Sequence, residues 1–129
     1  MPALFYKYFF YSLITLIWVV FKTSKVFNRK FKEAVGLYQA VYNFKYKDAS
    51  VQLVFDRGNI ELYYVEKFDP DFEINFLDLP GVLKSMKENP GDVMRLMLEN
   101  KIAKKGNNYY LLKFGYLIGL CRVQFQAAL

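Results

Sequence analysis

Few side chains in this 129-residue chain could carry out chemistry. Histidine is absent, which removes the usual general base near neutral pH and the commonest protein metal ligand. Without an imidazole to activate them, the four serines are poor nucleophiles: Ser12, Ser24, Ser50 and Ser85. The single cysteine, Cys121, lies in the apolar run LIGLCRVQF, so we expect a buried, inert thiol. The sequence also lacks the glycine-loop and metal-cluster motifs, and we expect no catalytic residue, no metal site and no cofactor.

The carboxylates that punctuate the chain stand in turn-like contexts. Asp56 opens the sequence DRGN, Asp69 and Asp71 flank a proline, and Asp78 precedes Leu-Pro-Gly. Aspartate favours turns and helix N-caps because its short side chain accepts hydrogen bonds from nearby backbone amides. We therefore interpret these residues as turn and capping residues, and we do not expect the protein to be an enzyme.

The composition points instead to apolar binding. Apolar residues make up 54% of the chain and aromatic residues 19%, more than the core of one small domain needs. Such an excess predicts a ligand cavity, a partner or a membrane contact. The positive charge is uneven, because residues 1–47 carry a net +7 and residues 48–129 a net −1. The near-neutral remainder argues against a broad nucleic-acid-binding surface.

The most apolar stretch is residues 4–21, LFYKYFFYSLITLIWVVF, in which only Lys7 is charged. As a helix it would span about 27 Å, just short of a ~30 Å hydrocarbon core. The following FKTSK is a poor signal-peptide cleavage site. Two interpretations remain open: a membrane anchor, spanning the bilayer or lying in its interface, or a helix buried against the domain or a twin subunit.

In the membrane interpretation, the basic residues that follow keep the domain cytoplasmic and favour an anionic leaflet. The expected membrane-contact residues are Phe10, Trp18, Phe21, Lys22, Lys25 and Arg29. In the other interpretation, a homodimer could cover the apolar helix.

The rest of the chain predicts an α+β domain. Spacings of three and four predict helices, and alternation of apolar and polar residues predicts strands. The predicted helices cover residues 23–42, 79–86, 90–98 and 109–123, and the predicted strands 42–47, 51–55, 60–64, 72–76 and 101–105. The first four strands read as an antiparallel meander with a hairpin turn at 56–59. Asp78 and Asn89 are expected to cap helices, Asn100 to adopt a left-handed conformation, and 101–105 to be an edge strand.

This order of elements resembles the sterol carrier protein 2 (SCP2) family of lipid-binding domains over about residues 26–120. The opening of a helix by Asn89-Pro90, the step Asn100-Lys101-Ile102 and the turn Lys105-Gly106-Asn107 carry the resemblance, with Asn100 where the family has Gly. The stretch DPDFEI at 69–74 is also similar.

The resemblance implies an SCP2-like mixed, largely antiparallel five-stranded sheet covered by helices, with an extra apolar N-terminal helix. Residues 1–22 would form that helix and 23–129 the lipid-binding domain. An apolar cavity would hold a fatty-acyl, sterol or isoprenoid ligand. The expected lining residues are Leu53, Phe55, Phe76, Val82, Leu83, Met86, Val93, Met94, Met97, Leu98, Ile102, Phe114 and Leu117.

Two functions fit this expectation. The first is non-enzymatic binding, with or without transfer, of a lipid at a membrane surface. The second is an accessory or scaffold subunit that presents a lipid-like intermediate, such as a polyprenyl quinone, to partner enzymes.

Overall fold

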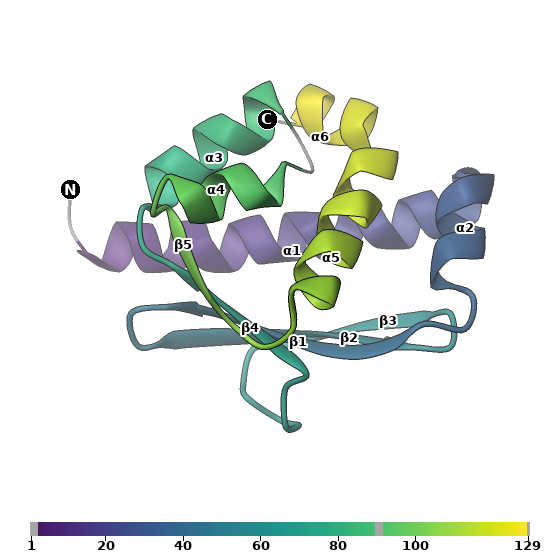
Figure 1. Cartoon of the computed structure of the whole chain (residues 1–129), viewed down its shortest axis with the longest axis horizontal. Helices are drawn as coiled ribbons and strands as arrows, with labels where there is room; N and C mark the ends of the chain where they lie inside the picture. Colours follow the sequence, from purple (N-terminus) through teal and green to yellow (C-terminus); the bar gives the residue numbers. More distant parts are fainter. Residues whose placement is uncertain (1–2, 90–91, 129) are drawn as a thin grey trace.

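The computed structural model describes residues 3–89 and 92–128, without the side chains of residues 3, 4, 93 and 94. The elements follow in the order α1 (Ala3–Phe27), α2 (Arg29–Val35), β1 (Gln39–Tyr46), β2 (Ala49–Asp56), β3 (Asn59–Tyr63), β4 (Phe72–Phe76), α3 (Leu79–Glu88), α4 (Val93–Leu98), β5 (Ile102–Lys105), α5 (Asn108–Leu120) and α6 (Arg122–Ala128). Figure 1 shows the helices gathered on one side of the sheet. The predicted α+β class is confirmed.

The sheet has five strands in the order β3-β2-β1-β4-β5. β4 runs parallel to β1, and the other neighbouring pairs are antiparallel. The mixed, largely antiparallel sheet is therefore confirmed, but the predicted meander is wrong at its fourth strand. Alternation of apolar residues specifies which face of a strand is buried, and it does not specify which strand lies alongside.

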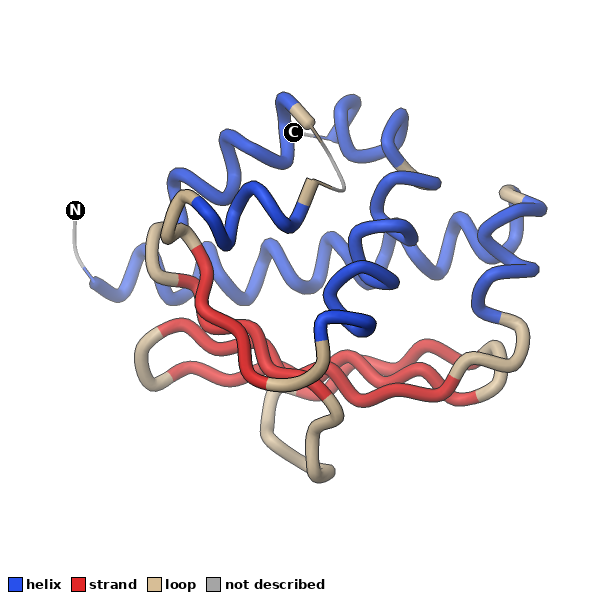
Figure 2. The backbone as a smooth tube through the Cα atoms, viewed as in Figure 1, coloured by secondary structure: helices blue, strands red, loops and turns tan. Residues whose placement is uncertain are grey.

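The connection from β3 to β4 crosses the face of the sheet that the helices leave open, below the sheet in Figure 2. Two buried amide side chains on that face hold it. Gln52 donates from Nε2 to the Phe68 carbonyl at 2.7 Å, and its Oε1 accepts from the amides of Lys67 and Phe68, both at 3.0 Å. Asn43 donates to the Glu66 carboxylate at 2.9 Å. This side-chain bonding anchors the crossover that lets β4 pair with β1.

Helix α1 packs against the helix-covered face of the sheet. The indole of Trp18 donates to the Ile60 carbonyl of β3 at 2.9 Å. The buried apolar side chains of α1 recur at helical spacing and belong to the hydrophobic core: Phe10, Leu13, Ile14, Ile17, Val20 and Phe21. The buried Ser24 continues this spacing. By length and composition alone, Phe5–Phe27 could cross a membrane. In this fold its apolar stripe is instead buried within the domain, one of the alternatives left open by the sequence.

Several element boundaries differ from the predictions. α1 continues to Phe27, and Asn28 then caps α2 by accepting from the Phe31 amide at 3.2 Å. The predicted helix 23–42 is thus divided, and β1 already begins at Gln39. Likewise, the predicted helix 109–123 is divided into α5 and α6 at Cys121. Apolar periodicity continues through each break, so the spacing of apolar residues alone does not reveal where one helix ends and the next begins.

Predictions from capping and turn residues were more accurate than those from apolar periodicity. Asp78 caps α3 by accepting from the Gly81 amide at 3.1 Å, and Asn100 has the expected left-handed φ of 58°. β5 lies at the edge of the sheet, as predicted. Asn89, however, ends α3, and Asp92 caps α4 by accepting from the Arg95 amide. The predicted helix start at Pro90 lies outside the described residues.

Candidate ligand-binding site

A small apolar cavity lies between the helix pair α3–α4, helices α1 and α5, and the sheet. Its lining comes from all of these layers: Ile17, Phe44, Ile74, Phe76, Val82, Ser85, Met86, Asn89, Asp92, Leu96, Ile102, Leu111, Phe114 and Ile118. The cavity measures about 30 Å³. A water molecule needs ~10–15 Å³ on this measure, and ligand pockets are ~300–1,000 Å³. The space in this conformation therefore holds about two waters, so an acyl chain would require it to expand.

The cavity lining is suited to apolar contact. Val82 and Met86 of α3 face aromatic and aliphatic side chains of the sheet and α5. Ser85, Asn89 and Asp92 supply the polar atoms, and Asn89 and Asp92 are exposed. The surface end of the cavity thus lies where α3 ends and α4 begins. Asp92 is the one ionisable side chain among the described lining residues, so dispersion and burial would dominate the binding of a ligand.

An apolar groove of about 210 Å³ lies on the other side of α3, between that helix and the start of α1. Its walls are Phe5, Tyr6, Phe9, Pro80 and Leu83. Successive residues of α3 serve the two spaces, because Leu83 lines the groove and Val82 lines the cavity.

An aromatic pair links the α1 segment beside the groove to the cavity lining. Phe10 follows the groove residue Phe9, and its ring packs edge-on against Phe76 of the cavity, with centroids 5.6 Å apart.

The predicted lining residues fall into several groups. Five line the cavity: Phe76, Val82, Met86, Ile102 and Phe114. Leu83 lines the groove, Met97 is half-buried, and Leu53, Phe55 and Leu117 are buried elsewhere in the core. Leu98 is 77% exposed, so its assignment to the cavity is wrong in this structure, because it lies on the outer side of the short α4. Val93 and Met94 lie outside the described side chains.

The sequence reasoning missed nine lining residues: Ile17, Phe44, Ile74, Ser85, Asn89, Asp92, Leu96, Leu111 and Ile118. Ile74 could have been found, because it alternates with Phe76 on one face of β4. Phe44 pairs directly with Ile74 in the parallel register, which the assumed meander concealed. Ile17 belongs to the segment considered as a membrane anchor.

The expected membrane-contact residues are divided by the fold. Phe10 and Phe21 have 0% exposure, so their assignment to a membrane contact is wrong for this conformation. Trp18 and Lys25 are half-buried, whereas Lys22 and Arg29 are exposed.

A cluster of tyrosines joins α5 to the sheet. The hydroxyl of Tyr42 donates to the Tyr110 carbonyl at 2.8 Å and lies 2.7 Å from the Tyr38 hydroxyl. Burial raises the pKa of Tyr38 to about 12 and the pKa of Tyr42 still further. Both phenols are therefore neutral at physiological pH, as a structural pair requires.

The thiol of Cys121 is buried, as predicted, and donates to Ser24 Oγ at 3.1 Å. Its burial raises the pKa of the thiol, which disfavours the reactive thiolate. Among the described residues, no group of three or more His, Cys, Asp or Glu side chains could hold a metal ion.

Neither the protein-family models nor the curated proteins contain a match to this chain. Solved structures do match. A protein described as UbiJ-SCP2 ubiquinone synthesis protein has a TM-score of 0.67 at 18% identity, covering 87% of this chain and 98% of that one. The apo sterol carrier protein 2 of Yarrowia lipolytica has a TM-score of 0.51 at 18% identity, covering 82% and 89%.

Two further solved structures are similar to this chain. The sterol carrier protein domain 2 of Helicoverpa armigera has a TM-score of 0.51 at 14% identity, covering 84% of each chain. The sec-alkylsulfatase Pisa1 of Pseudomonas sp. has a TM-score of 0.55 at 12% identity, but only 14% of that chain is matched. At these identities the likenesses establish the fold alone. Together with the mixed sheet and its covering helices, they show that this chain has an SCP2-like fold.

Proposed function

We propose that this SCP2-like domain binds a lipid or another apolar ligand without catalysing a reaction, and that it works at a membrane surface. The observation that carries the proposal is the pair of apolar spaces flanking α3, the cavity behind Val82 and Met86 and the groove beside Leu83. The likeness to sterol carrier proteins supports the same function.

The ligand would enter by displacing α3 rather than by filling a preformed tunnel. Met86 favours such expansion, because an unbranched thioether adapts to irregular apolar shapes. Burying about 14 methylenes gains roughly 11 kcal/mol at ~0.8 kcal/mol each. Association and opening of the cavity subtract several kcal/mol, leaving a free energy of about 6–8 kcal/mol, which corresponds to a micromolar Kd. With so few polar contacts, selectivity among apolar ligands would be low.

A second function is supported by a specific observation. The match to the ubiquinone synthesis protein covers 98% of that chain, and its TM-score of 0.67 exceeds the 0.51 of the sterol carrier proteins. This favours an accessory subunit that presents a lipid-like intermediate, such as a polyprenyl quinone, to partner enzymes. Purification from the native host would separate the two functions, because only the accessory subunit would bring down a stable enzyme partner.

The test of ligand binding uses the full chain. Native mass spectrometry and lipid extraction identify any co-purified ligand, and titration with a fluorescent long-chain fatty acid and a fluorescent polyprenyl analogue measures uptake. We expect Met86→Phe, which fills the cavity, and Leu83→Trp, which fills the groove, to weaken uptake. Leu98→Trp, at an exposed position on α4, is the control and should bind as the parent does. A folded parent protein that carries no lipid and takes up neither probe would refute the proposal.

A further inference from the structure

Helix α5 has an unusual outward face. Four residues at helical spacing point away from the core, and we call them the α5 stripe: Tyr109, Leu112, Tyr116 and Gly119. Tyr109, Leu112 and Tyr116 are each more than half exposed. The opposite face is buried through Leu111, Phe114, Leu117 and Ile118. The four stripe residues thus carry no charge, and Lys113 lies beside them.

Such a face calls for a partner. A helix that is apolar all round is normally buried, and a surface helix normally turns a polar face to water. Gly119 adds a second indication, because a Cβ placed there would meet no atom within 4 Å. Glycine inside a helix lowers stability by roughly 0.5–1 kcal/mol relative to alanine, and here no contact within the domain requires it. We infer that the α5 stripe is covered when the protein is at work.

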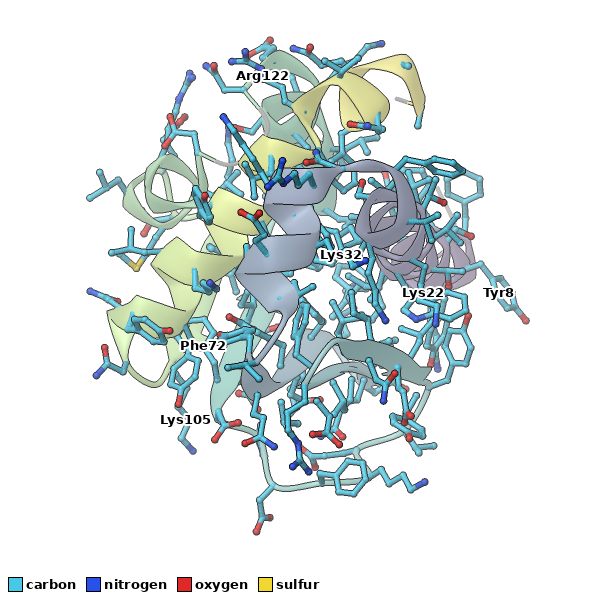
Figure 3. All side chains as sticks on the ribbon, turned by 90° about the vertical axis from the view of Figure 1, so that its right-hand side faces the viewer. Tyr8, Lys22, Lys32, Phe72, Lys105 and Arg122 are labelled. Carbon is cyan, nitrogen blue, oxygen red and sulfur yellow. The ribbon has the colours of Figure 1, made fainter. Side chains whose placement is uncertain are left out.

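The surroundings of the stripe specify the charge of that partner. Helices α5 and α6 carry Lys113 and Arg122 and no acidic residue. The end of α1 and helix α2 add Lys22, Lys25, Arg29, Lys30 and Lys32 against the single Glu33. Figure 3 shows Lys32 on α2 with Arg122 above it and Lys22 to one side. Cations far apart in the sequence therefore gather around α2 and α5.

An open recess joins the α5 stripe to this basic region. It measures about 500 Å³ and is lined by Lys30, Glu33, Ala34, Lys113 and Tyr116. Lys113 donates to the Ala34 carbonyl at 3.1 Å, and its Nζ lies 5.0 Å from the Tyr38 ring centroid. The ammonium of Lys113 is thus held at the recess, beside the stripe residue Tyr116.

We propose that the face formed by α2 and α5 docks on an anionic phospholipid membrane. The stripe lies at the boundary between headgroups and acyl chains, where tyrosine and leucine of an interfacial helix are favoured. A lipid phosphate occupies the recess beside Lys30 and Lys113. This inference rests on the proposed function, which gives the domain a reason to bind membranes. The contact is peripheral and is made by α2 and α5, whereas the membrane-anchor interpretation would insert α1 into the bilayer.

Charge also distinguishes the membrane from a second copy of the chain. Two α5 stripes packed together would bring Lys113 and Arg122 of both copies close to one another. Residues 100–129 offer no carboxylate to compensate the repulsion. An anionic bilayer has the complementary charge and can cover an extended face.

Vesicle sedimentation of the full chain tests the docking. The vesicles are phosphatidylcholine alone, or phosphatidylcholine and phosphatidylglycerol in equal parts, at low and at high ionic strength. We expect binding to the anionic vesicles only, and weaker binding at high salt. Each cation near an anionic surface contributes about fivefold in affinity, so the reversal Lys30→Glu should lower binding about 30-fold. Lys87→Glu makes the same charge change on the exposed side of α3 and should lower binding far less.

A second pair of variants tests the apolar stripe. Leu112→Ser should weaken vesicle binding at least fivefold, whereas Leu98→Ser on α4 should leave it unchanged. Both positions are exposed, so folding should survive each substitution.

Four results would overturn the docking proposal. They are equal binding of the parent protein to neutral vesicles, no binding to anionic ones, equal effects of Lys30→Glu and Lys87→Glu, and a solution dimer that Leu112→Ser dissociates. Fatty-acid uptake in solution, measured on the same variants, keeps the two proposals separate. A parent protein that takes up the fatty acid but does not dock refutes this inference alone, and a parent protein that docks without uptake refutes ligand binding alone.

Discussion

The amide side chain of Gln52 provides the sharpest test of how the sheet is held together. It is completely buried and makes three hydrogen bonds to the backbone of Lys67 and Phe68 in the crossover between β3 and β4. Gln52→Leu keeps the approximate volume and removes all three. At about 1 kcal/mol net for each bond, the loss is ~3 kcal/mol. Lys67 and Phe68 are both exposed, so water can replace part of the lost hydrogen bonding. We therefore expect the free energy of unfolding to fall by about 2–3 kcal/mol.

Two measurements check this expectation. Urea unfolding gives the change in the free energy of unfolding, and hydrogen exchange reports the amides of Lys67 and Phe68, which should lose protection before the rest of the sheet. Gln39→Leu is the matched control, because Gln39 is exposed and bonds only to Asp56 at 3.0 Å. We expect the control to change stability by less than about 0.5 kcal/mol. If Gln52→Leu behaves like the control and both amides stay protected, the anchoring role assigned to Gln52 is refuted.

Three further predictions follow from buried or constrained groups. Burial raises the pKa of Tyr38 from 10.0 to about 12 and that of Tyr42 further, so the folded state retains both protons more tightly than the unfolded chain. Stability should therefore be complete below about pH 10 and decline as the pH rises towards 12, and the double substitution Tyr38→Phe and Tyr42→Phe should flatten that decline in alkaline melting curves. Gly106 has a φ of 124°, and an added Cβ would come within 2.9 Å of Phe72. Gly106→Ala should therefore lower the free energy of unfolding by about 1–3 kcal/mol. Gly119→Ala, where an added Cβ meets open space, should raise the free energy of unfolding by roughly 0.5–1 kcal/mol. Cys121 should resist a thiol reagent in the folded protein and react once denaturant exposes it, and rapid reaction under native conditions would contradict its burial.

Local signals in the sequence predicted local structure well. The cap at Asp78, the left-handed Asn100 and the β2–β3 hairpin depend on residues within a few positions of one another, so composition and spacing contain the information. The position of β4 does not depend on neighbours in this way. Its place beside β1 follows from a crossover anchored by Gln52 and Asn43, two polar residues in strands whose apolar alternation gave no sign of that role.

Residues of the candidate site were predictable only where the periodicity of a single helix or strand places them on its inward face. Val82 and Met86 lie on the inward face of α3, and Phe76 on the inward face of β4, so their periods placed them on apolar faces and the family resemblance assigned them to a cavity. Phe44 and Ile17 reach the same cavity because β1 pairs with β4 and α1 packs on the sheet. Such contacts depend on the tertiary arrangement, which periodicity within an element does not contain.

The N-terminal segment shows why an apolar helix is ambiguous between a membrane and a core. Its buried positions, from Phe10 through Ile17 to Ser24, recur at three and four residues, as in an amphipathic helix packed on a core. The stripe is hidden in the sequence because the flanks are also apolar or aromatic. Residues outside the stripe also make contacts within the domain. Trp18 donates a hydrogen bond to β3, and Phe5 and Phe9 line the groove beside α3. Different sides of α1 thus contact the sheet, the core and the groove, while Tyr8 and Val19 remain exposed. The extra hydrophobicity of α1 enlarges the apolar surface next to the cavity, which is where a lipid-binding domain would need it.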